Sequence, residues 1–233
     1  MPFYYDTIYW IVLIPVLILS VYAQIKVSST FNRYGKVANR RRITGAQAAY
    51  EVLRSNGVTG VDIRPCSGSL TDHYDPRSNT IYLSQPVYNA ATVSAVGVAA
   101  HEAGHAVQYA QAYGPIQVRS AIIPVTQFGS KFAFIALMLG LVLYSQPVFA
   151  ICIAIFGLTA LFQLVTLQVE FNASARALRT IDGALLLDEE ERRGAKRVLT
   201  AAALTYVAAL LMSLVQLLRY LLIFASRGGN RRD

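Results

Sequence analysis

The chain has 233 residues, of which 55% are hydrophobic and 15% charged, whereas ordinary soluble domains carry about 25% charged residues. The scarce charges leave long stretches that are almost purely apolar, which argues for a membrane protein and against a large soluble core. The formal net charge is +8, but the basic residues flank apolar runs instead of forming one face or arm, so we expect no nucleic-acid partner.

Four apolar runs are each long enough to cross a bilayer as a helix. The first, residues 7–25, follows a start without Lys or Arg, so it is predicted to be a retained anchor and not a signal peptide, which needs a basic start. Residues 122–144 and 147–168 form a predicted hairpin of two spans, and residues 199–224 form the last. Lys131 falls inside the second span, where it either reaches the membrane interface or has a function within the membrane.

These spans divide the chain into six segments. They are an N-terminal transmembrane anchor (1–25), an α+β region (26–118), a transmembrane hairpin (119–168), a second polar segment (169–198), a final transmembrane helix (199–224) and a polar tail (225–233).

Basic residues cluster in the two polar regions and are missing before the first span. They are Lys26, Arg33, Lys36, Arg40, Arg41 and Arg42 in the first region, and Arg176, Arg179, Arg192, Arg193, Lys196 and Arg197 in the second. Because Lys and Arg concentrate on the cytoplasmic side, both regions are predicted to face the cytoplasm from the plasma (inner) membrane. Three arginines in the polar tail favour the opposite orientation and are outnumbered.

The first polar region is predicted to mix helices and strands. Residues 44–55 have a helical pattern, with Thr44 as a possible N-cap and Gly57 just beyond the end. Residues 59–65 and 80–84 are rich in β-branched residues and Tyr and predict short strands, joined by turn formers at 67–79. A further helix is expected over about 94–112, ended by Gly114 and Pro115.

That last helix contains the sequence HEAGH, which fits the HExxH pattern. His101 and His105 are four residues apart, so their imidazoles project from one face and can bind a single zinc ion. Glu102 lies about 100° around the helix from His101, where it can take a proton from a zinc-activated water as a general base. The alternative is two surface histidines on an amphipathic helix, but the surrounding small apolar residues argue against it.

The third ligand does not follow the metzincin spacing, because Gln108 and Gln111 occupy the positions where that pattern needs Gly and His. Glu170 is the first acid after the motif and directly follows an apolar span. Two spans separate it from His105, so the chain returns to the same face of the membrane. We favour Glu170 as the third ligand, with His73 as the fallback; the competing interpretation is that Glu170 is an interfacial charge at the end of a span.

The stretches TGAQAAYEVLRSNGV, HYDPRSNTIYLS, GVAAHEAGHAVQYA and VEFNASARAL resemble the bacterial neutral zinc metallopeptidases, the YugP-like membrane proteins, and the resemblance covers nearly the whole chain. More distantly, the chain is similar to the membrane gluzincins that include the HtpX stress proteases and the CAAX prenyl proteases. The resemblance implies that His101, His105 and Glu170 bind one zinc ion and that Glu102 is catalytic. The distant group has Asp where this chain has Ser174, so Ser174 or Asn172 is expected to orient a zinc-bound His.

A substrate strand and an oxyanion-stabilising group are also needed. The strand at Thr80, Ile81, Tyr82 and Leu83 is a candidate to hold an extended substrate as an edge strand, or it is simply part of the scaffold. Candidates to stabilise the oxyanion are His73, Tyr74, Arg77 and Arg176.

The sequence thus predicts a mainly α integral membrane protein of about four transmembrane helices, with a small α+β zincin-like cytoplasmic region. The expected activity is zinc-dependent hydrolysis of peptide bonds in peptide or membrane-protein substrates near the bilayer. The alternative is a membrane scaffold or chaperone-like protein with a structural zinc site, which would need four protein ligands. A small transporter is disfavoured because the spans carry few polar residues.

Overall fold

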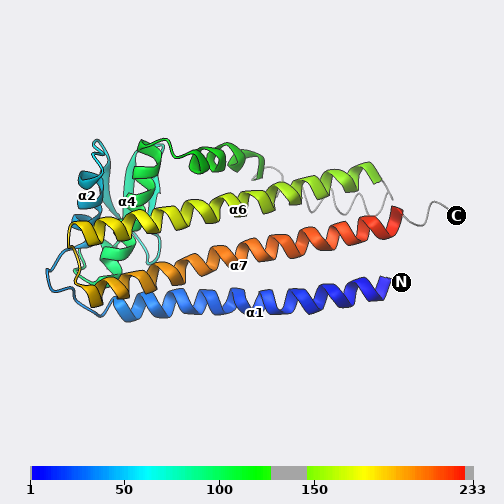
Figure 1. Ribbon diagram of the computed structural model, residues 1–233, viewed down its shortest axis with the longest axis horizontal. Coiled ribbons are helices and arrows are strands. Elements are labelled where there is room, and N and C mark those ends of the chain that lie inside the picture. Colours follow the sequence, from blue (N-terminus) through cyan, green and yellow to red (C-terminus); the bar gives the residue numbers. More distant parts are fainter. Residues whose placement is uncertain (1, 127–145, 229–233) are drawn as a thin grey trace. The chain divides into compact units, whose positions relative to one another are not determined.

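The computed structural model describes residues 2–126 and 146–228 (Figure 1). The chain divides into two compact units, which we call the helical unit (residues 1–22, 118–167 and 206–233) and the α+β unit (residues 23–117 and 168–205). Three long helices contribute residues to both units: α1 (Pro2–Tyr34), α6 (Gln146–Gly183) and α7 (Glu189–Gly228).

All three long helices are long and apolar enough to cross a membrane. The predicted spans at 7–25, 147–168 and 199–224 lie inside α1, α6 and α7. The prediction of a span at 122–144, with Lys131, falls outside the described residues apart from 122–126, which are helical. The structure therefore supports a mostly helical protein with three candidate spans.

The helices do not end where the apolar runs end. α6 has 38 residues, which is about 57 Å of helix against a hydrocarbon core of about 30 Å. The polar residues that follow its apolar run are good enough helix formers to continue it. In the second polar segment, predicted at 169–198 as a helix and a loop, α6 continues to Gly183 and α7 begins at Glu189.

Within the helical unit, α1 packs against α7 through a small apolar cluster of Tyr9, Leu13, Val16 and Val215. The Arg219 guanidinium lies 4.3 Å from the centre of the Tyr9 ring. Other large apolar side chains of α1 point outward, and Ile11 and Ile18 are more than 60% exposed. Such exposed apolar side chains are costly in water and are typical of a helix that contacts lipid or another protein.

The first helix that lies wholly within the α+β unit is α2 (Gly45–Ser55). Thr44 caps it as predicted: its hydroxyl accepts from the Gln47 N–H, and the Gln47 side chain accepts from the Thr44 N–H. This reciprocal pair satisfies two backbone donors that the first turn leaves open. Gly57, with φ +68°, follows the end of the helix.

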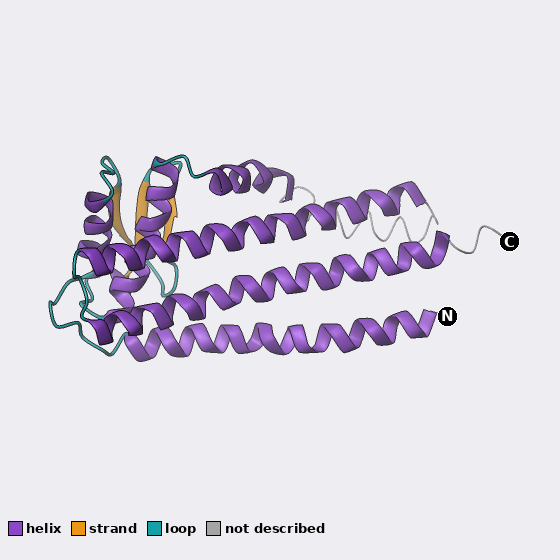
Figure 2. Ribbon diagram, viewed as in Figure 1, coloured by secondary structure: helices purple, strands orange, loops and turns teal. Residues whose placement is uncertain are grey.

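Three short strands form a mixed sheet (orange in Figure 2). They are β1 (Asp62–Cys66), β2 (His73–Asp75) and β3 (Thr80–Ser84), in the order β1-β3-β2. β1 runs parallel and β2 antiparallel to β3. Two expectations are corrected: β2 lies within the stretch predicted to be only turns, and the strand at Thr80–Leu83 is the middle strand and not an edge.

Two helices follow the sheet, α3 (Gln85–Tyr88) and α4 (Val93–Ala110). The Thr92 hydroxyl caps α4 by accepting from the Ala95 N–H. α4 ends at Ala110, two residues before the predicted end, and Gly114 and Pro115 begin a new helical segment, since Pro is tolerated in a first turn. The core of the unit joins α2, β3, α4 and the end of α6, with Val52, Ile81, Val96 and Ile181 fully buried.

Candidate metal centre

Helix α4 carries the two histidines of HEAGH. His101 and His105 lie one turn apart, with ring centres separated by 4.7 Å and planes at 83° to each other. Thr92 fixes the start of this helix, and the residues beside the histidines are small, including the fully buried Ala99 and Ala103. Small side chains let a second helix approach the histidine-bearing helix closely.

That second helix is α6, and Gly104 sets the distance. A Cβ atom at position 104 would lie only 2.7 Å from the carbonyl oxygen of Ala173. Any other residue would push the helices apart, so the glycine allows this close approach. The contact brings Glu170, one turn before Ala173 on α6, to the two histidines.

The three predicted ligand residues converge. The Oε2 atom of Glu170 lies 3.1 Å from His101 Nε2 and 3.6 Å from His105 Nε2, and all three ligand atoms lie within 4.8 Å of one another. Ligands bound about 2.0–2.2 Å from a tetrahedral zinc are about 3.4 Å apart. The donor set and its spacing therefore fit zinc after small side-chain adjustments, with Glu170 only 3% exposed.

Each histidine uses its other ring nitrogen in a hydrogen bond. His101 Nδ1 lies 3.0 Å from the Ser174 hydroxyl, in the contact expected for Ser174. His105 Nδ1 lies 2.9 Å from Oε1 of Gln108. Asn172, the other candidate for orienting a histidine, instead accepts from the Gln108 side chain. Sequence reasoning missed Gln108, although its i,i+3 spacing from His105 places the two side chains side by side.

Glu102 is half-buried and follows His101 directly.

The pKa of His105 reflects two opposing effects. Burial alone would lower the pKa of His105. The hydrogen bond and charge of Glu170, helped by the charge of Glu102, outweigh burial and raise the pKa of His105 above 6.5. The two carboxylates thus surround the histidines with negative charge, which also favours a cation.

The oxyanion candidates have contacts of their own. His73 Nδ1 bonds to the Thr71 carbonyl at 2.8 Å, and the Tyr74 hydroxyl donates to the Asn79 side chain at 2.7 Å. Arg77 is exposed, and its backbone N–H donates to Asp75. Arg176 donates from Nε to Asn172 at 2.7 Å and from Nη1 to Gln111. An oxyanion role for these four residues stays a prediction.

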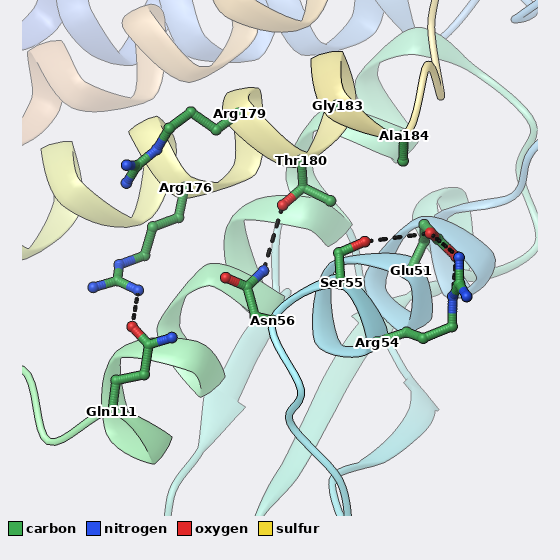
Figure 3. Close-up of a pocket in the computed structure, with 10 residues that line it drawn as sticks. All are labelled: Glu51, Arg54, Ser55, Asn56, Gln111, Arg176, Arg179, Thr180, Gly183 and Ala184. Atoms are coloured by element: carbon green, nitrogen blue, oxygen red, sulfur yellow. Dashed lines mark hydrogen bonds and ion pairs between the residues drawn. The ribbon is translucent and has the colours of Figure 1, made fainter.

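A cavity of about 680 Å³ opens beside the C-terminal half of α6 (Figure 3). Its lining consists of Glu51, Arg54, Ser55, Asn56, Gln111, Arg176, Arg179, Thr180, Gly183 and Ala184. Six residues separate Arg176 from Glu170, which is about 240° around the helix. The cavity is thus on a different face of α6 from the ligand carboxylate.

Comparison with known proteins identifies the family of the chain. A family model described as "Putative neutral zinc metallopeptidase" matches residues 9–225. The chain is 44% identical over 215 residues to the "Putative membrane protease YugP" of Bacillus subtilis (strain 168), covering 92% of this chain and 94% of that protein. No solved structure matches the chain. The match spans both polar regions and all three candidate spans, and the chain therefore belongs to this family of membrane-associated zinc metallopeptidases.

Proposed function

We propose that the protein is a gluzincin-type zinc metalloendopeptidase that hydrolyses peptide bonds with Glu102 as general base. The observation that carries this proposal is the convergence of His101, His105 and Glu170, whose ligand atoms lie within 4.8 Å of one another. A catalytic zinc site usually has three protein ligands and one open position, whereas a structural site is closed by four. Three His and carboxylate ligands from two helices match the catalytic arrangement.

The residues divide the chemistry between them. Zinc bound there would polarise the scissile carbonyl and lower the pKa of a water towards about 7. Glu102 accepts the proton of the attacking water on its carboxylate. It then donates that proton to the nitrogen of the departing amine, which regenerates the carboxylate. The His101 and His105 rings keep their Nε2 atoms aimed at the metal position through Ser174 and Gln108.

The substrate is proposed to add to β2 and not to the middle strand at Thr80–Leu83. β3 is already paired on both sides, whereas β2 is an edge strand of the sheet. The Tyr74 ring of β2 lies 5.5 Å from the Tyr109 ring of α4, so this edge adjoins the HExxH helix. Main-chain pairing to an edge strand holds a peptide in extended form with little sequence selectivity, which suits peptide or membrane-protein substrates.

The protein is further proposed to sit in the plasma membrane with its metal centre facing the cytoplasm. The support is the set of six basic residues that directly follow the first apolar run, within 26–42, and the start without Lys or Arg.

The test of the mechanism is Glu102→Gln, which keeps the shape of the side chain and removes the base. The purified variant should retain zinc and lose peptide hydrolysis by several orders of magnitude, about the scale seen for loss of catalytic acid–base groups. Glu51→Gln, a change of the same kind on α2, should leave the rate unchanged. Undiminished hydrolysis by Glu102→Gln would refute the mechanism, and loss of zinc would mean that Glu102 is a ligand.

A further inference from the structure

Gln108 is a fully buried polar side chain on the HExxH helix, three residues after His105. Its amide makes three hydrogen bonds: to His105 Nδ1 at 2.9 Å, to the Val169 carbonyl at 2.9 Å and to Asn172 Oδ1 at 3.0 Å. Val169 and Asn172 flank the ligand Glu170 on α6. One amide therefore joins the ligand on α4 to the backbone beside the ligand on α6.

These contacts determine which atom donates. The Val169 carbonyl can only accept, so the Gln108 NH2 group must face it and Oε1 must face His105. The reversed amide would place two acceptors against each other. Because Oε1 can also only accept, the proton of neutral His105 is on Nδ1. The lone pair is then on Nε2, the atom directed towards Glu170.

His101 has no such constraint from its own partner. The Ser174 hydroxyl can donate or accept, so it orients the ring without selecting the tautomer. The amide of Gln108, in contrast, both orients the His105 ring and selects its tautomer.

Asn172 and Arg176 extend the hydrogen-bond network of Gln108. Asn172 Oδ1 accepts from Gln108 Nε2 and from Arg176 Nε, the latter at 2.7 Å. The Arg176 guanidinium also donates to the Gln111 side chain at the end of α4 (Figure 3). A charged donor strengthens such a bond and fixes which end of the Asn172 amide is the acceptor. The chain of contacts runs from Arg176 through Asn172 and Gln108 to His105.

We propose that Gln108 is the positioning residue for the zinc ligand His105, selecting its Nδ1–H tautomer, and that Asn172 and Arg176 support it. This proposal rests on the proposed zinc site. Residues that bond the far nitrogen of a metal-bound His fix the ring and raise its basicity, and their loss costs about 10–100-fold in metal affinity.

The experiment measures zinc affinity of the full-length, detergent-solubilised protein by competition with a chelator, and the visible spectrum of its cobalt form. Gln108→Met keeps the volume and removes the acceptor, so the zinc Kd should rise about 10–100-fold and the cobalt spectrum should change. Gln108→Glu keeps an acceptor for His105 Nδ1–H but loses the donor to the Val169 carbonyl and to Asn172, so its zinc Kd should rise less than that of Gln108→Met. Gln117→Met, the same change at an exposed position, is the control and should bind normally.

Two results would overturn the proposal. One is an unchanged zinc Kd and cobalt spectrum in Gln108→Met. The other is equal weakening in Gln108→Met and Gln108→Glu, because then the acceptor that faces His105 Nδ1 contributes nothing to zinc binding. A wild-type protein that binds no zinc would instead refute the proposed function itself.

If Gln108→Met fails to fold, Arg176→Gln tests the same chain from its outer end. It should weaken zinc binding measurably but by less than loss of Gln108. Arg179→Gln on the same helix, whose Nε bonds only to the Ala175 carbonyl among the contacts of the described residues, should not. Equal zinc affinity in these two arginine variants would contradict the supporting role of Arg176.

Discussion

Gly104 shows how much of the metal centre depends on one missing side chain. The proposed ligands come from two helices, and the backbone contact between Gly104 and Ala173 determines how far apart those helices lie. A zinc site tolerates errors in ligand distance of only about 0.2 Å. A methyl group at position 104 is small in volume but would displace one helix by several times that tolerance.

We therefore predict that Gly104→Ala weakens zinc binding and lowers stability by about 1–3 kcal/mol, the usual cost of overpacking. Gly114→Ala is the matched control, since a Cβ atom there meets nothing within 4 Å. Zinc affinity and the thermal midpoint of both variants check this. Normal zinc binding by Gly104→Ala would show that the close helix contact is not needed.

The raised pKa of His105 leads to a prediction about pH. Zinc requires the neutral ring, so protons compete with zinc. Because the pKa of His105 in the metal-free protein lies above 6.5, competition should begin above that pH as the solution is acidified. The zinc Kd should then rise about tenfold per pH unit.

The sign follows from linkage: a raised His pKa stabilises the metal-free fold below the unfolded value, and this stabilisation is lost as the pH rises through the folded value. Zinc titrations at several pH values give the zinc Kd as a function of pH, and the midpoint is the pH at which the Kd begins to rise. Because the charge of Glu102 helps to raise the pKa of His105, Glu102→Gln should move the midpoint to lower pH. A midpoint below 6.5 in wild type would contradict the prediction.

At the scale of elements, local signals predicted some features and tertiary contacts decided others. The Thr44 cap, the end of the HExxH helix and the strand at Thr80–Ser84 follow from local sequence, because caps, Gly-Pro and β-branched residues act locally. β2 was missed because three residues among turn formers become a strand only by pairing with β3. The middle position of β3 is likewise a property of pairing and not of its own residues.

The candidate site divides in the same way. The spacing of His101 and His105 can be recognised in the sequence because one helix carries both. Glu170 could be predicted to lie near them because it is the first acid after the motif. Gln108 could not be identified from the sequence. Its role depends on a hydrogen bond to the Val169 carbonyl of α6, which only the tertiary structure shows.

The orientation of the long helices gives the prediction at this scale. A reporter fused near residue 40, after α1, should behave as cytoplasmic, and one at residues 145–147 as external. The reason is the excess of Lys and Arg in the polar regions. Alkaline phosphatase and fluorescent-protein fusions at both positions distinguish the sides, and the reverse pattern would contradict the proposed cytoplasmic metal centre.

At the scale of the whole molecule, the metal would cross-link two parts of the chain that are far apart in sequence, since 65 positions separate His105 from Glu170. A ligand that binds only the folded state stabilises it by mass action, by about 2.7 kcal/mol at 100 times its Kd.

We thus expect Glu170→Ala to bind zinc more weakly and to lose the stabilisation that added zinc gives to wild type. Thermal unfolding of both proteins with chelator and with zinc measures this. Glu190→Ala, an exposed acid on α7, is the control. If Glu170→Ala bound zinc as wild type does, the third ligand would have to be sought elsewhere, beginning with His73.

The continuity of α6 has a mechanical consequence. From Gln146 to Gly183 the chain is one unbroken helix, so a candidate membrane span and Glu170, the proposed third ligand, belong to the same element. A shift of this helix along its axis by one residue moves every side chain by about 1.5 Å. That is a large fraction of the 3.1 Å and 3.6 Å between Glu170 Oε2 and the two imidazole Nε2 atoms. Bilayer thickness acts on hydrophobic length, so we expect zinc affinity to depend on the thickness of the membrane if Glu170 is the third ligand.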